Sequence, residues 1–411
     1  MSAAEHSARG LGRDGTILFV TRALRMFSYG FLSVILVLYL SSLGFGEGRI
    51  GLLITLTLLG DTLVSLWITT RADRIGRRNM LVIGAALMTA AGIPFALSGD
   101  FTVLLIAATI GVISPSGNEV GPFLAIEQAS LSQVLADERR TAVFAWYNLT
   151  GSLATATGAL TGGWVAQALQ AGGMSPAASY RVLVAAYAAF GLALAAAFLL
   201  LSKSVEAPVR AQTTGRLGLS KESRPVVAKL AGLFSLDAFA GGFVIQSIMA
   251  YWFHLRYGVS PGVLGSIFFF ANILAGISAL MAARIAKRIG LVNTMVFTHL
   301  PSNVLLILVP LMPTLPLAIA MLLARFSISQ MDVPTRQSYT MSVVKPEERS
   351  AAAGVTGIAR TTGASISPAL TGQLIASSAL MNAPFLISGG LKIVYDLLLY
   401  RSFRRNEKKY N

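Results

Sequence analysis

A charged group interrupts one of the apolar segments in the last third of the sequence. The stretch RFSISQMDVPTRQ, residues 325–337, follows the apolar run LPLAIAMLLA. Arg325, Ser329, Asp332 and Arg336 have i, i+4, i+7, i+11 spacing, which places them along one stripe of a continuous helix. A charge at the centre of a bilayer costs on the order of 3 kcal/mol or more, so such residues face a partner or a cavity. The pattern predicts either an Asp332–Arg336 ion pair within the helix or a charged stripe facing a water-accessible cavity.

Charged residues occur in other apolar segments as well. A carboxylate in a low-dielectric cavity tends to hold a proton and an arginine beside it opposes this, so an acid that changes partners could bind and release a proton. We rank Asp237, Asp332, Glu119 and Glu127 as candidates for this coupling, although each could instead form a fixed ion pair. Arginines could pair with these acids or bind an anionic solute, because guanidinium presents a planar fork to carboxylate or phosphate. The arginines concerned are Arg22, Arg25, Arg325, Arg336 and Arg360.

The composition is that of a membrane protein with many spans. The 411 residues are 54% hydrophobic and 12% charged, and the mean hydropathy is +0.67, whereas about a quarter of an ordinary soluble domain is charged. About 20 apolar residues suffice to cross a bilayer, and twelve such segments recur along the chain. They lie near 16–41, 49–70, 80–98, 101–134, 141–170, 179–202, 226–257, 261–283, 293–311, 315–341, 350–376 and 383–402. We expect the first span to remain as a helix, because no cleavage site of a signal peptide follows a short apolar segment.

The basic residues outside these spans are distributed unevenly. The segments on the side of both termini carry nearly all of the Lys and Arg residues, whereas the opposite segments carry only Arg49, Arg181 and Arg256. This asymmetry follows the positive-inside rule, and it predicts that both termini are cytoplasmic. The net charge of +15 therefore requires no nucleic acid as a partner. The short loops suit a bacterial inner membrane.

The sequence divides into two similar halves. A polar stretch at 203–225 separates a predicted N-terminal bundle, residues 1–202, from a C-terminal bundle, residues 226–411. A shift of 214 residues places DRIGRRNMLV (73–82) on KRIGLVNTMV (287–296), and a shift of 210 places ALTG (159–162) on a second ALTG (369–372). Two registers of similar size indicate an internal duplication. The first register sets Asp237 opposite Ala23, and it predicts a contact of Asp237 with Arg22 or Arg25.

The loop after the second span carries a recognisable motif. Its sequence RADRIGRRN resembles the loop signature of the major facilitator superfamily, with Asp73, Arg74, Gly76, Arg77 and Arg78 at the matching positions. The leading glycine of the signature is Thr69 here. The resemblance covers essentially the whole chain and implies an all-α membrane fold of twelve helices in two pseudo-symmetric six-helix bundles. It also implies that this motif clamps the two bundles together at the cytoplasmic side.

A second resemblance concerns the fifth span. Antiporters of the family carry Gly-Pro-x-x-Gly-Gly there, and GALTGG matches it at Gly158, Gly162 and Gly163, with Ala159 in place of proline. These glycines could form an antiporter-type hinge or a close helix crossing, since small residues let backbones approach. The arginine that the family places in the middle of span four is absent.

These patterns together favour a proton-coupled secondary transporter that works by alternating access. We expect export, in exchange for protons, of a small amphiphilic compound or an organic anion; the alternative is a proton-driven importer or a facilitator of a small anion. The predicted partners are the solute, protons and the lipid bilayer, with the chain a monomer. An enzyme is not expected, because motifs such as H-E-x-x-H, G-x-S-x-G and the Walker loop are missing. With no cysteine and three histidines, no metal or cofactor is expected either.

We further expect Lys392 to reach water from a span end, Asp396 to lie near the membrane surface and His299 to lie near a loop.

Overall fold

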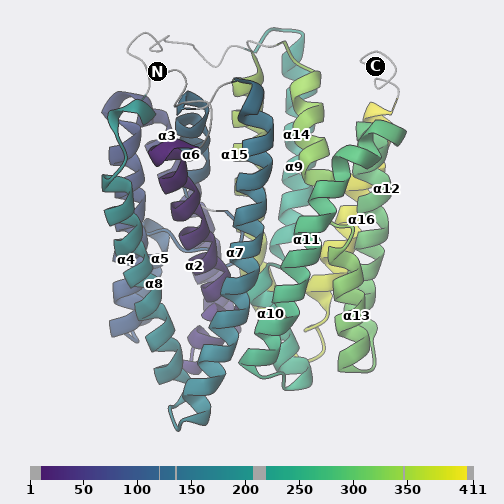
Figure 1. Cartoon of the computed structure of the whole chain (residues 1–411). Coiled ribbons are helices and arrows are strands. Elements are labelled where there is room, and N and C mark those ends of the chain that lie inside the picture. The colour runs from purple at the N-terminus through teal and green to yellow at the C-terminus, as the bar shows by residue number, and fades with distance from the viewer. Residues whose placement is uncertain (1–10, 120, 135–136, 207–218, 346–347, 405–411) are drawn as a thin grey trace.

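The chain folds into a bundle of helices whose axes run in roughly the same direction (Figure 1). The computed structural model describes residues 11–119, 121–134, 137–206, 219–345 and 348–404, and these residues form no strand. Within them, nine of the twelve spans are single helices. These are α2 (Gly12–Ser42), α3 (Glu47–Ile75), α4 (Arg77–Leu97), α7 (Asp137–Ala171), α8 (Pro176–Leu199), α11 (Pro261–Ile289), α12 (Leu291–Leu308, continued by the 3-10 turn η3, Val309–Leu311), α15 (Arg349–Ile375) and α16 (Ala383–Phe403).

Spans four, seven and ten are each broken into two shorter helices. The pairs are α5 (Phe101–Ile110) with α6 (Phe123–Val134), α9 (Ser223–Gly242) with α10 (Gln246–Tyr257), and α13 (Leu315–Phe326) with α14 (Asp332–Ser342). In the described part of the chain, eight helical segments are long and apolar enough to cross a membrane by length and composition, with α9 and α10 taken as one. The breaks and the polar residues of α7 and α15 account for the other four spans.

The turns between helices repeat at the same spacing in both halves. Gly76 joins α3 to α4 with φ = 108°, and Gly290 joins α11 to α12 with φ = 88°. Each donates its N–H to the carbonyl of an alanine four residues earlier, Ala72 or Ala286. Because a side chain is strained at these φ values, both turns need glycine. The two glycines are related by the 214-residue shift, as expected of a duplicated half.

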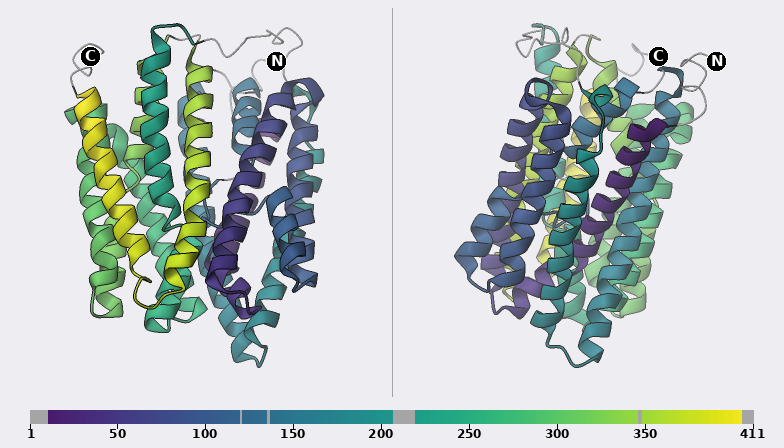
Figure 2. Two further views of the ribbon diagram at one scale, coloured as in Figure 1. Left: turned by 180° about the vertical axis from the view of Figure 1, so that it is seen from behind. Right: turned by 60° about the vertical axis from the view of Figure 1, so that its left-hand side comes forward.

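The two halves occupy opposite sides of the molecule, and α2 begins at the same end at which α16 finishes (Figures 1 and 2). We call this end the terminal side and the opposite end the distal side. Within the N-terminal half α2 packs on α7 and α8, and α4 packs on α8; within the C-terminal half α9 packs on α15, and α12 packs on α16. Between the halves the main contacts are α3 with α15 and α7 with α11. The repeat relates α3 to α11 and α7 to α15, so the two interfaces are pseudo-symmetric.

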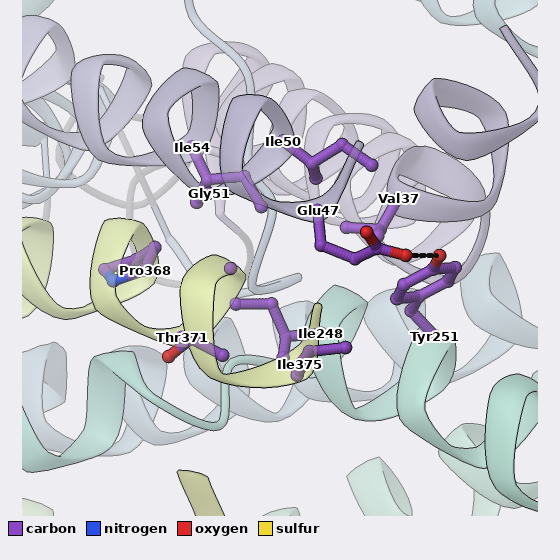
Figure 3. Close-up of a pocket in the computed structure, with 11 residues that line it drawn as sticks. Val37, Glu47, Ile50, Gly51, Ile54, Ile248, Tyr251, Pro368, Thr371 and Ile375 are labelled. Carbon is purple, nitrogen blue, oxygen red and sulfur yellow. Dashed lines mark hydrogen bonds between the residues drawn. The ribbon is translucent and has the colours of Figure 1, made fainter. Parts of the chain in front are cut away.

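The halves meet closely at the distal side, where the facing residues are glycine and proline. A Cβ atom at Gly51 of α3 would lie 2.4 Å from the Pro368 carbonyl of α15, and one at Gly163 of α7 would lie 2.3 Å from the Pro261 carbonyl of α11. Close to the first crossing, the Tyr251 hydroxyl donates to the Glu47 carboxylate at 3.0 Å. These two residues border a small, mainly apolar pocket between the halves, which Val37, Ile50, Ile54, Ile248, Pro368 and Ile375 also line (Figure 3).

The predicted linker packs on the N-terminal half where the structure describes it. After the 3-10 turn η1 (Lys203–Val205), Glu206 accepts hydrogen bonds from the backbone N–H groups of Arg77 and Arg78, at 2.6 and 3.2 Å. Residues 207–218 of the predicted linker lie outside the described residues. The chain resumes before α9, which begins at Ser223, three residues before the predicted start of the C-terminal bundle.

Candidate functional site

A buried ion-pair network joins spans one, four and five. Arg25 of α2 is fully buried. Its Nη1 and Nη2 atoms donate to the two Glu127 oxygens at 2.6 and 2.7 Å, and its Nε atom donates to Glu119 at 2.9 Å. Arg22 also donates to Glu119, at 2.5 Å, and the Tyr147 hydroxyl donates to Glu127. We call Arg22, Arg25, Glu119, Glu127 and Tyr147 the N-terminal cluster; in it each charge is paired and one acid has two basic partners.

The break in span four presents Glu119 to this cluster. Gly117 and Gly121 have φ values of 69° and 80°, so the chain between α5 and α6 leaves the helical path on both sides of Glu119. Two side chains satisfy carbonyls freed by the break: the Tyr187 hydroxyl donates to Val112 at 2.7 Å, and Ser114 donates to Asn118 at 2.8 Å. Irregular backbone is tolerated inside a membrane protein when its polar groups find such partners.

Asp61 of α3 is a buried acid that our ranking of coupling residues omitted. It is 8% exposed, and among the described residues its Oδ1 atom has no hydrogen-bond partner. The charged side chain that acts on it electrostatically is another acid, Glu119. The sequence offered one signal, since Asp61 lies inside the second apolar segment.

A second buried network lies in the C-terminal half. Asp237 of α9 accepts hydrogen bonds from Lys392 of α16 at 2.6 Å and from Arg336 of α14 at 3.2 Å. Arg336 also donates to Asp332 at 2.9 Å, one helical turn away. The ion pair within span ten is therefore present, but it is part of a larger network. Asp237, Asp332, Arg336 and Lys392, together with His299 and Asp396, are called the C-terminal cluster below.

Three members of this cluster lie deeper than expected from the sequence. Lys392 is 7% exposed and bonded to Asp237, so it does not reach water from the span end as we predicted. Asp396 is fully buried, not near the surface, and it contacts His299 Nδ1 at 2.8 Å and accepts from Asn303 at 2.9 Å. His299 is likewise buried in α12 rather than placed near a loop. Polar partners on neighbouring helices explain these errors, because they lower the cost of burying the charge.

The predicted contact of Asp237 with Arg22 or Arg25 is wrong. Arg22 and Arg25 pair with acids of span four in their own half, whereas Asp237 pairs with bases of spans ten and twelve in its own half. The register does relate spans one and seven. The charges at related positions, however, are neutralised by neighbours in the same bundle.

The predicted continuous stripe on span ten is also wrong in one respect. Turns at 327–330 separate Arg325, at the end of α13, from Asp332, at the start of α14. Pro334 lies in the first turn of α14, where its missing N–H costs least, and it cannot continue a helix from the preceding turn. Arg325 still interacts electrostatically with Asp237 and Asp332. Among the described residues, neither Arg325 nor Arg360 of α15 forms a hydrogen bond or ion pair through its guanidinium, and the Nε atom of each is buried.

The loop motif between α3 and α4 contacts the N-terminal half and the segment after it. Arg77 donates to Asp73 at 2.8 Å and to the carbonyls of Ala129 and Val205, each at 3.2 Å. Arg78 donates to the Leu201 carbonyl at 3.2 Å, while Asp73 and Arg74 are exposed. In the described part of the chain no hydrogen bond or ion pair of this motif reaches the other half. The expected clamp between the halves is therefore not formed in this conformation.

The fifth-span glycines lie at close helix crossings. Cβ atoms at Gly158 and Gly162 would lie 2.0 and 2.3 Å from the carbonyls of Phe27 and Phe31 on α2. Gly163, on another face, meets α11 of the opposite half. Of the two interpretations given above, the geometry displays the close crossing; α7 is one continuous helix through these residues.

The chain has two six-helix halves, twelve spans in all, and a buried charge network in each half. This is the arrangement of membrane transporters that bind a solute at the interface of two halves. Within the described residues, no group of three or more His, Asp or Glu side chains could hold a metal ion. The chain belongs to the major facilitator superfamily, whose family profile matches residues 18–368. It is a membrane-spanning transporter and not an enzyme.

Individual relatives show how far this assignment extends. The Saccharomyces cerevisiae protein named "Uncharacterized membrane protein YJR124C" is 32% identical, over 94% of this chain and 93% of its own length. The Staphylococcus aureus quinolone resistance protein NorA is 29% identical over 98 residues, which is 24% of this chain and 25% of NorA. A variant of the nucleoside transporter NupG has the same fold, with a TM-score of 0.75 at 14% identity over 94% of this chain and 99% of that one. These likenesses establish the family and the fold.

Proposed function

We propose that this transporter couples solute movement to protons and exports a small amphiphilic compound or an organic anion by alternating access. One observation carries the proposal: acids and bases in both clusters share partners. Glu119 is held by Arg22 and Arg25, while Arg25 also holds Glu127. Asp237 is held by Lys392 and Arg336, while Arg336 also holds Asp332.

Shared partners provide a physical route for coupling. If Glu127 or Asp332 takes up a proton, its base stays paired with the other acid: Arg25 with Glu119, or Arg336 with Asp237. No isolated charge is then left in the membrane. Protonation then alters which helices are held together, and a change in helix contacts is what alternating access requires. Asp61 is a further candidate proton carrier, since a buried carboxylate without a basic partner among the described residues is neutralised most simply by binding a proton.

The direction of transport and the topology are parts of the same proposal. The partial fifth-span signature favours export. The uneven distribution of Lys and Arg supports cytoplasmic placement of the terminal side.

The unpaired Arg325 and Arg360 favour an anionic solute, and they also support the second candidate, a proton-driven importer of a small anion. The bacterial inner membrane stays a prediction, since one relative that matches 94% of this chain is from yeast.

The test uses purified protein in liposomes that contain a pH dye. With the interior made acidic, we add candidate solutes outside and record internal pH. Internal alkalinisation that needs both protein and solute is expected of proton exchange. Asp237→Asn and Asp332→Asn should abolish it while retaining the folded protein, whereas Glu222→Gln, at an exposed acid, should not. Solute uptake without proton movement would refute the coupling, and proton entry together with the solute would support the importer.

A further inference from the structure

Two guanidinium groups in the C-terminal half each have a buried Nε atom without a hydrogen-bond partner among the described residues. Arg325, at the end of α13, is 9% exposed, and Arg360 lies near the middle of α15, with its side chain partly buried. In both, the Nε atom is buried and has no hydrogen-bond partner, and no ion pair within 4.0 Å involves either side chain among the residues described. Arg25 of the other half shows the usual arrangement, with three hydrogen bonds to acids.

The acids near these two arginines are already engaged. Asp237 and Asp332 are the carboxylates that act electrostatically on both Arg325 and Arg360. Asp237 is bonded to Lys392 and Arg336, and Asp332 is bonded to Arg336. Arg336 repels Arg360 and does not neutralise it. With Asp396, which contacts His299, this part of the C-terminal half holds three acids against four bases, Arg325, Arg336, Arg360 and Lys392, so positive charge remains in excess.

The geometry leaves the donors of Arg325 available. Its guanidinium carbon lies 5.0 Å from the centre of the Phe326 ring. A ring against the face of a guanidinium stabilises the cation while leaving the N–H groups at its edge free. A buried donor without an acceptor is costly, and an excess positive charge out of water costs more. An anion with several acceptor oxygens would remove both costs.

We propose that Arg325 and Arg360 form a binding site for the oxyanion group, carboxylate or phosphate, of the transported solute. Spans ten and eleven each supply one guanidinium, and the N–H forks of arginine match the oxygens of such a group. Arg336 is already bonded to Asp237 and Asp332, so the two unpaired arginines are the ones left to bind the ligand. The proposal rests on the proposed function only in assigning the bound anion to the solute, because binding itself requires no proton gradient.

The test is thermal unfolding of the purified full chain in detergent, without any gradient. The probes are benzoate, citrate, inorganic phosphate and glycerol phosphate, each compared with sodium chloride at equal ionic strength. Benzamide and glycerol serve as uncharged counterparts. We expect at least one oxyanion to raise the unfolding temperature of the wild type, and the uncharged compounds to have no effect. Comparison of the carboxylates with the phosphates identifies the preferred group.

The variants Arg325→Met and Arg360→Met separate binding from structure. Without ligand they should unfold at the same temperature as the wild type or higher, since each removes a positive charge that has no ion-pair partner among the described residues. In both, the oxyanion effect should disappear or need at least about tenfold more anion, about 1.4 kcal/mol of binding free energy. Arg284→Met, at an exposed arginine of α11, should respond as the wild type does.

Three results would overturn the site: no oxyanion stabilises the wild type, the effect persists in both variants, or both variants are destabilised without ligand. The last would show that the arginines are structural. Proton coupling is judged separately in liposomes. Intact anion binding without proton movement contradicts the proposed coupling alone, and proton exchange without the oxyanion effect contradicts this site alone.

Discussion

The buried charged residues of this protein differ in whether other residues of the chain supply partners for all of their charged atoms. Arg25 is fully buried and has an acid for each of its hydrogen-bonded nitrogens, whereas Arg325 and Asp61 are buried with unpaired atoms. A fully paired residue in a low-dielectric region is held in place, because any movement leaves a partner uncompensated. An unpaired residue gains from a ligand or a proton. Fully paired residues therefore have a structural role, whereas residues with unpaired atoms are candidates for binding a ligand or a proton.

Removal of Arg25 should therefore destabilise the protein strongly. Arg25→Met leaves Glu127, which is 0% exposed, without a cation, and breaking a buried pair in this way costs about 3–5 kcal/mol. Chemical unfolding in detergent measures the loss. The double variant Arg25→Met/Glu127→Gln removes the stranded charge and should recover part of the stability. An Arg25→Met protein as stable as Arg284→Met would contradict the assigned role.

Glu348 gives a prediction about pH outside the membrane-spanning segments. The Ser223 hydroxyl donates to its carboxylate at 2.6 Å and the Ser220 N–H at 2.5 Å, and these bonds lower the pKa of Glu348 from 4.5 to about 2. Because the folded pKa lies below the unfolded one, the carboxylate stabilises the fold fully above about pH 5 and loses this effect as pH falls towards 2.

Unfolding temperatures between pH 7 and pH 3 test this assignment. Glu348→Gln should unfold at a lower temperature than the wild type at pH 7, and the difference should shrink as the pH falls. Glu222→Gln, at an exposed acid nearby, is the matched control. A difference that does not depend on pH would show that the charge of Glu348 is not what stabilises the start of α9.

At the scale of whole helices, small residues set how closely the spans approach. The α3–α15 crossing uses Gly51 against Pro368, and the α7–α11 crossing uses Gly163 against Pro261. Gly51 and Gly265, which also lies at the second crossing, are related by the 214-residue shift. The two crossings join the halves at the distal side, so they carry the contacts that have to separate if that side opens.

Gly163→Ala should weaken this contact, because the added methyl would lie 2.3 Å from the Pro261 carbonyl and 2.8 Å from the Cα atom of Gly265. Overpacking of this kind costs about 1–3 kcal/mol. The expected result is a lower unfolding temperature together with greater labelling, from the distal side, of a cysteine placed at Ile54. Gly354→Ala is the matched control: nothing lies within 4 Å of its Cβ position, and alanine favours the helix by up to about 1 kcal/mol. Equal behaviour of the two variants would exclude the crossing as the cause.

Helices were easier to predict from the sequence than the partners of their charges. Apolar length placed the spans, as for residues 179–202 against α8 (Pro176–Leu199). The register related Asp237 to Arg22 and Arg25 correctly as positions, but it could not show that each would be neutralised within its own half. His299 and Asp396 were misplaced because they lie on different spans, and only tertiary packing brings them within 2.8 Å.

The whole molecule shows an inverted arrangement of charge between its halves. In the N-terminal half, span one supplies the bases and span four the acids; in the C-terminal half, span seven supplies the acid Asp237 and span ten the base Arg336. Each half neutralises much of its own charge, so the halves can move as units without separating ion pairs. The contacts between them at the distal side are instead glycine crossings and neutral or single-charge hydrogen bonds, which cost less to break.

A disulfide across the distal contact should therefore stop transport. The Ala369 backbone N–H donates to the Thr55 hydroxyl at 2.9 Å, which joins α15 to α3. The chain has no cysteine of its own, so Thr55→Cys/Ala369→Cys introduces the one available pair. Oxidation should lock the halves together and abolish solute-dependent flux in liposomes, and a reductant should restore it. Thr89→Cys/Ala188→Cys, which joins α4 to α8 within one half, should tolerate oxidation if the halves move as rigid units. Full flux with the distal disulfide formed would rule out alternating access through this contact, whereas loss of flux in both pairs would show that motion within a half is also required.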